Sequence, residues 1–179
     1  YRFRYLKNIM GLWMIQSVRK EIVPDMSFGQ ICELASKEPI KSIVDVNDNR
    51  FLAPSNMTEE VKRACAESRQ QVPDSIAQIA AVIYNSLAEC YASTVKEIEG
   101  LTHKNYEYIH IVGGGANAGY LNELTANETR KTVYAGPTEA TAIGNIASQM
   151  IADGKLKDLK DARRCIFDSF EIKEYNPDL

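Results

Sequence analysis

Residues that commonly bind metals or form disulfides are scarce in this sequence. It has four cysteines and two histidines among 179 residues, and it contains no Cys-x-x-Cys pair or Cys/His cluster. Zinc sites and redox pairs need such clusters, so the pattern argues against both, and no metal-binding residue is predicted. Sparse, unpatterned cysteines are typical of free thiols in a reducing compartment, which predicts a cytoplasmic protein.

Basic runs and long apolar runs are also missing. The net charge is −3, and without clustered Lys and Arg to bind phosphates no nucleic-acid partner is predicted. No stretch reaches the roughly 18 apolar residues of a membrane span, so no membrane association is predicted. The chain opens with Tyr1 and has neither an initiator Met nor a signal peptide, so we expect further sequence upstream.

Apolar residues at helical spacing predict a helix-rich first half. The predicted helices cover residues 6–21, 27–37, 58–71 and 75–100. Residues 43–54 are rich in Asp and Asn and predict a loop with room for a short strand. The helix over residues 75–100 is the longest, and we expect it at the centre of the core.

The second half alternates strands and helices. Residues 106–112 are β-branched and aromatic and predict a strand that runs directly into three glycines. The elements expected after them are a helix over residues 118–129, a strand over 131–134, helices over 138–152 and 157–169, and a polar tail over 171–179. This order implies parallel strands, and so an α/β fold, helix-rich with a small, partly parallel sheet. The rest of the sheet is expected upstream of Tyr1.

The glycine run is the strongest candidate binding feature. Gly113, Gly114 and Gly115 allow close approach of a ligand to the backbone, and the next helix presents its positive end, which suits a phosphate. A tight turn without a ligand is the alternative. Residues 133–136 lack the acidic residue that a dinucleotide site needs, which disfavours NAD. No Gly-Lys-Ser/Thr occurs, which excludes a P-loop.

Three segments resemble the C-terminal domain of the FGGY carbohydrate kinases, which belong to the actin/hexokinase-like (ribonuclease H-like) superfamily. They are VGGG at residues 112–115, LNELTAN at 121–127 and AGPTEATAIGN at 135–145. Two further segments, LKNIMGLWMIQ at 6–16 and NDNRF at 47–51, are similar to the rhamnulokinase subfamily. The resemblance runs nearly end to end and implies an actin/hexokinase-like ATPase lobe that uses ATP and Mg²⁺.

The resemblance also implies roles for particular residues. The glycine loop of such kinases lies near the ribose and α-phosphate, which makes Gly113, Gly114 and Gly115 ATP-binding residues. Asn8 matches a residue that contacts the sugar substrate, and Gln16 matches one that contacts ATP. Eight helical residues span about 12 Å and turn about 80°, so one helix would reach both ligands. The catalytic base is expected upstream, and no catalytic residue is predicted here.

Residues 1–179 are therefore expected to be the C-terminal nucleotide-binding domain of a larger two-domain kinase, inactive when isolated. The implied reaction is ATP-dependent phosphorylation of L-rhamnulose to L-rhamnulose 1-phosphate in cytoplasmic rhamnose degradation. One alternative is a kinase for another sugar, such as fuculose, xylulose or glycerol. The other is a non-catalytic regulatory lobe that binds nucleotide. No oligomeric state is predicted.

Overall fold

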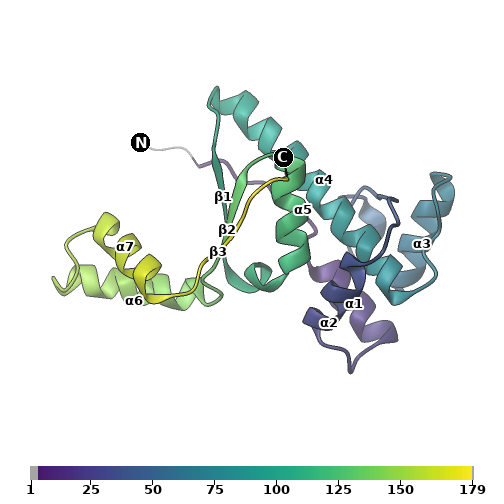
Figure 1. Cartoon of the computed structure of the whole chain (residues 1–179), viewed down its shortest axis with the longest axis horizontal. Helices are drawn as coiled ribbons and strands as arrows, with labels where there is room; N and C mark the ends of the chain where they lie inside the picture. Colours follow the sequence, from purple (N-terminus) through teal and green to yellow (C-terminus); the bar gives the residue numbers. More distant parts are fainter. Residues whose placement is uncertain (1–3, 179) are drawn as a thin grey trace.

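The computed structural model describes residues 4–178, which form a helical end, a small central sheet and a projecting helix pair (Figure 1). The helices are α1 (Trp13–Ile22), α2 (Phe28–Ser36), α3 (Met57–Glu67), α4 (Ile76–Thr102), α5 (Gly119–Thr129), α6 (Ala140–Ala152) and α7 (Leu159–Ser169). The strands are β1 (Tyr108–Ile111), β2 (Thr132–Ala135) and β3 (Lys173–Tyr175), and short 3₁₀ turns cover η1 (Asn49–Phe51) and η2 (Gly113–Asn117).

The sheet has the order β1-β2-β3. β1 and β2 are parallel, with Tyr108 opposite Thr132, and α5 connects them, which confirms the predicted parallel pair. β3 pairs antiparallel with β2, with Val133 opposite Tyr175. The prediction of a polar tail without regular structure was wrong here. A strand of three residues is too short to show a periodicity, and it forms because β2 offers an edge to pair with.

The core is built around α4, as the length of its apolar pattern predicts. Ile79, Ile83 and Leu87 on this helix are fully buried or nearly so. α2 and α5 pack along it, and Tyr84 meets Tyr120 of α5 edge to face with ring centroids 6.1 Å apart. This packing fixes α5 against the helical end, and α5 in turn carries the loop that follows β1.

The first helix is shorter than its sequence pattern predicts. α1 begins at Trp13, and residues 4–10 precede it without helical structure. Gly11 has a φ of +64°, which ends the non-helical segment in a conformation that an α-helix does not use. Ile9 and Met10 are partly buried against the core. The apolar residues of this non-helical segment are therefore spaced as they would be on a helix. Asn8 therefore does not lie on one helix with Gln16, and that prediction was wrong.

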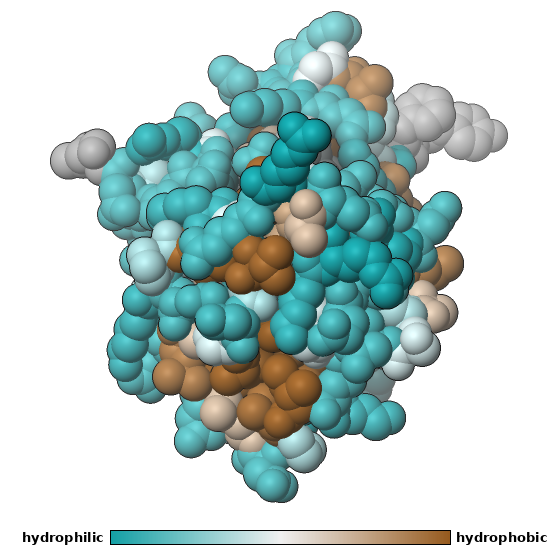
Figure 2. Space-filling model, turned by 90° about the vertical axis from the view of Figure 1, so that its right-hand side faces the viewer, coloured by the Kyte–Doolittle hydropathy of each residue, from teal (hydrophilic) through white to brown (hydrophobic). Residues whose placement is uncertain are grey.

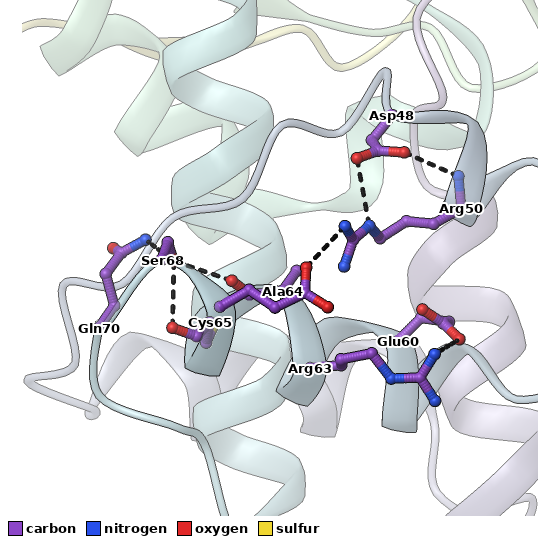
Figure 3. A network of polar contacts seen from close by, with 9 residues as sticks. Asp48, Arg50, Glu60, Arg63, Ala64, Cys65, Ser68 and Gln70 are labelled. Atoms are coloured by element: carbon purple, nitrogen blue, oxygen red, sulfur yellow. Dashed lines mark hydrogen bonds and ion pairs between the residues drawn. The ribbon is translucent and has the colours of Figure 1, made fainter.

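The loop over residues 43–54 is ordered by side chains instead of a strand. The Gln70 side chain accepts a hydrogen bond from the Ile43 N–H at 2.9 Å and donates one to the Ile43 carbonyl at 2.7 Å, so it stands in for a neighbouring strand. Arg50 contacts Asp48 at 3.1 Å (Figure 3). It also contacts Glu67 of α3 at 2.8 Å. The Arg50 backbone N–H, followed by its guanidinium, holds the pKa of Asp48 below its usual value.

Lys131 ties the start of the sheet to the end of α4. Its Nζ donates to Glu99 Oε1 at 2.8 Å and to the Tyr106 carbonyl at 2.6 Å. The Tyr106 N–H donates to the same Glu99 oxygen at 2.9 Å. The hydrogen bond from Lys131, and then that from Tyr106, holds the pKa of Glu99 below its usual value. A carboxyl whose pKa is lowered on folding stabilises the fold above its unfolded pKa, and this contribution is lost as the pH falls through the folded value.

Lys131→Met is therefore expected to lower the melting temperature by a few degrees at neutral pH. The variant should also lose less stability than the parent between neutral pH and the acid range below about pH 4.3, the unperturbed glutamate pKa. Thermal unfolding followed by circular dichroism across this pH range measures both effects. Lys160→Met is the control, because Lys160 is exposed and has no ion pair within residues 4–178. Parallel pH curves for both variants would contradict the expectation.

Candidate nucleotide site

The glycine turn lies at the carboxyl edge of the two parallel strands. η2 follows β1 directly, and the segment after β2 lies against it. The Gly113 N–H donates to the Pro137 carbonyl at 3.1 Å, and the Gly136 N–H donates to the Ile111 carbonyl at 2.8 Å. In open α/β sheets, ligands bind at this edge of the strands, so the turn stands where a binding loop is expected.

The three predicted ATP-binding glycines differ in what each requires. Gly113 has a φ of +75°, a conformation that side chains other than glycine rarely adopt. A Cβ on Gly115 would lie 3.4 Å from Ile111 Cγ2, at the edge of normal packing. A Cβ on Gly114 would meet no atom of the described chain within 4 Å. The fold thus requires glycine at 113 and favours it at 115. At 114 the fold does not require glycine, and only a ligand that approaches the backbone would.

The helix that follows the turn has a free N-terminus. α5 begins at Gly119, and its N-cap residue, Ala118, makes no side-chain capping bond. One of its first N–H groups, on Tyr120, donates to Cys32 Sγ at 3.3 Å. An uncapped helix N-terminus leaves backbone donors and a partial positive charge available, which suits an anionic group.

A cavity of about 290 Å³ lies between the glycine turn and the start of α6. Its polar lining includes Asn117, Thr138, Glu139 and Lys173. The Thr138 hydroxyl donates to Asn117 Oδ1 at 3.3 Å, so the loops after β1 and β2 meet here. The sequence interpretation missed Asn117 and Thr138. Their signal was position, since each is a polar residue in the loop that follows a predicted parallel strand.

The other two predicted site residues lie elsewhere. Asn8 lines a separate, mostly apolar cavity of about 650 Å³ together with Trp13 and Asn47. Gln16 is exposed on α1 and donates only its backbone N–H, to the Leu12 carbonyl at 3.0 Å, within the described chain. Neither residue lines the cavity beside the glycine turn. Their contacts with sugar and ATP stay predictions, as do the contacts of the three glycines.

Two general properties bear on function. Within residues 4–178, no three or more His, Cys, Asp or Glu side chains come together in a way that could hold a metal ion. In the same part of the chain, no helix combines the length and apolar character needed to cross a membrane.

A parallel β–α–β unit with a glycine turn and a cavity at its carboxyl edge is typical of α/β nucleotide-binding domains. Residues 2–152 match the C-terminal domain of the FGGY family of carbohydrate kinases. The chain belongs to this family. The match confirms the predicted actin/hexokinase-like ATPase lobe, helix-rich with a small, partly parallel sheet.

Rhamnulokinases are similar to the chain along nearly its whole length. The rhamnulokinase of Halalkalibacterium halodurans is 49% identical over 175 residues, which cover 98% of this chain and 38% of that protein. The Bacillus subtilis rhamnulokinase is 47% identical over 175 residues, covering 97% of this chain and 36% of the relative. That of Yersinia pestis is 38% identical over 177 residues, covering 98% and 36%. The chain thus spans little more than a third of the length of these curated relatives.

Proposed function

We propose that the chain is the C-terminal, nucleotide-binding lobe of a longer, two-domain sugar kinase. The proposed reaction transfers phosphate from ATP to L-rhamnulose and yields L-rhamnulose 1-phosphate in cytoplasmic rhamnose degradation. The observation that carries this proposal is similarity to rhamnulokinases over 97–98% of the chain. The glycine turn at the carboxyl edge of the parallel strands supports the ATP-binding part of it.

The residues of the turn fit the nucleotide in a specific way. The open space around Gly114 lets a nucleotide approach the backbone, and the uncapped N-terminus of α5 would favour a phosphate nearby. Asn117 and Thr138 would offer polar contacts on the cavity side. ATP supplies the phosphoryl group when bound, whereas this lobe binds and orients the nucleotide. As the family resemblance implies, we propose that Mg²⁺ and the base are held by the rest of the kinase.

Exposed apolar surface supports the proposal of a larger protein. The α6–α7 pair projects away from the sheet (Figure 1), and Ile146 and Phe167 on it are 57% and 61% exposed. On β1 and just after it, Tyr108 and Val112 are 53% and 55% exposed. In a two-domain kinase, further protein would cover these apolar side chains.

The helical end of the molecule also has apolar surface. Figure 2 shows brown patches within a largely hydrophilic surface on the side of the molecule where α1, α2 and α3 lie in Figure 1. Among exposed residues of this part of the chain, Phe28 is 46% and Leu52 is 66% accessible. In a two-domain kinase, such surface would face the other domain or the cleft between them.

An activity assay of the full-length protein tests the proposal directly. With ATP and Mg²⁺ present, L-rhamnulose should be phosphorylated with a higher kcat/KM than fuculose, xylulose or glycerol. A preference for one of these other sugars would change the proposed substrate but leave the proposal of a sugar kinase unchanged. Nucleotide binding without transfer to any sugar would instead favour a regulatory lobe.

Substitutions of Asn8, before α1, and Gln16, within α1, are expected to affect the binding of different ligands. In the full-length kinase, Asn8→Ala should raise the KM for sugar and Gln16→Ala the KM for ATP, each with little effect on the other ligand. Loss of one hydrogen bond is worth on the order of 1 kcal/mol, or about fivefold. Steady-state kinetics with each substrate varied in turn measures both. Lys20→Ala, one turn beyond Gln16 and also exposed, is the control. Equal changes in both KM values for both variants would indicate general damage to this region.

A further inference from the structure

A buried amide connects α5 to the glycine turn. Asn122 is 0% exposed, and its Nδ2 donates to the Ala116 carbonyl at 3.1 Å. Ala116 belongs to η2, two residues after Gly114. The helix after the turn therefore reaches back with a side chain and holds the backbone of the turn that precedes it.

The turn has further ties besides its own 3₁₀ hydrogen bonds. At the start, the Gly113 N–H donates to Pro137, and at the end the Ala118 N–H donates to the Gly115 carbonyl at 3.1 Å. The contact between Thr138 and Asn117, at 3.3 Å, is long and exposed. The bond from Asn122 is a buried side-chain tie to the turn, which otherwise depends on its own 3₁₀ hydrogen bonds. Its loss would remove the side-chain support of the Ala116 carbonyl, two residues from Gly114.

This arrangement does not serve stability well. Since a carbonyl can accept only from the amide NH₂, this contact sets the orientation of the Asn122 amide and leaves its Oδ1 to find another partner. This oxygen is buried and has no hydrogen-bond partner among residues 4–178. Asn122 lines a mostly apolar cavity of about 400 Å³ together with Leu12, Ile111 and Val95. A buried acceptor without a partner destabilises a fold, so removal of this oxygen should offset the loss of the bond to the Ala116 carbonyl.

A second buried polar residue of α5, Thr125, can be compared with Asn122. Thr125 lies about one turn further along the helix, is 1% exposed and lines the same cavity. Its hydroxyl donates to the Leu121 carbonyl at 2.6 Å, within the helix itself. Thr125 is thus satisfied locally and does not contact the glycine turn, whereas Asn122 contacts the turn and leaves one of its atoms unsatisfied.

We infer that Asn122 is a positioning residue for the nucleotide: it holds the turn in the conformation that keeps Gly114 open to the ligand. This role rests on the proposed function, because it presumes that the turn binds ATP. It predicts that stability and nucleotide affinity respond in opposite directions at this position. A residue with a merely structural role would lose both together.

Asn122→Leu in the full-length kinase tests the role. Asn122→Leu removes the unpaired Oδ1 and buries more apolar surface, so the melting temperature should be unchanged or higher. The Kd for ADP, measured by isothermal titration calorimetry, should rise about fivefold, the factor expected for one lost hydrogen bond. The KM for ATP should rise by the same factor, with the KM for sugar and kcat unchanged. Asn122→Ala, which cannot overpack, should show the same change in affinity.

Thr125→Val is the matched control, and it should leave the Kd for ADP unchanged whatever its melting temperature. Unchanged ADP affinity in both Asn122 variants, with normal binding by the parent, would overturn the role and leave the proposed function standing. If the parent protein binds no nucleotide, the proposed function itself is refuted, and with it the role of Asn122. Failure of both variants to fold, or equal shifts in the KM for ATP and sugar, would make Asn122 a structural residue only.

Discussion

Gly114→Val in the full-length kinase is expected to weaken ATP binding on the order of a hundredfold while leaving the melting temperature nearly unchanged. The branched side chain would occupy the space through which a nucleotide reaches the backbone. Loss of about two hydrogen bonds to a charged ligand, at roughly 1.5 kcal/mol each, corresponds to such a factor. The fold should tolerate the change, because a Cβ at this position meets no described atom within 4 Å and φ is not positive. Calorimetric titration with ATP and thermal unfolding measure the two quantities.

Two other glycines serve as controls with opposite expectations. Gly113→Ala should lower stability by about 1–2 kcal/mol, because φ is +75° there. Gly100→Ala, on α4 with open space around its Cβ, should raise stability by up to about 1 kcal/mol and leave ATP binding unchanged. A Gly114→Val variant that binds ATP normally would show that the loop is only a turn.

Residues 1–179 alone are expected to transfer no phosphate to L-rhamnulose at any concentration of the chain. The glycine turn supplies one wall of the proposed nucleotide site, and the described residues offer no metal ligand set. Phosphoryl transfer needs both a positioned base and a metal ion at the phosphates. Nucleotide binding should be weak, roughly millimolar or about 4 kcal/mol, with ADP and ATP nearly alike because the terminal phosphate has few partners.

Titration of both nucleotides by NMR, beside an activity assay of the full-length protein, measures the two parts of this expectation. Turnover by residues 1–179 would place the base within this chain and contradict the proposed division of labour. Binding of ATP much more tightly than ADP would mean that this lobe holds the terminal phosphate itself. Either result would change the roles assigned here to the rest of the kinase.

The sequence by itself determined the features that depend on neighbours in the chain. The apolar pattern of α4 and the strand that runs into Gly113 are local signals, and both elements formed where expected. The parallel pairing of β1 and β2 also followed, because a helix between two strands brings the second alongside the first. The motifs around the glycines were sufficient to indicate the family.

The tertiary structure alone decided features that depend on partners far along the chain. β3 exists because β2 offers it an edge, and residues 4–10 are non-helical because Gly11 turns the chain and Ile9 packs against a core built by other helices. Packing also separated the three glycines, giving Gly114 the open position. Asn122 lies in the LNELTAN segment, but the sequence does not indicate its contact, which depends on a carbonyl brought within reach by the fold. Helical periodicity reports burial of a face, but which atoms a buried group meets is set only when distant segments pack.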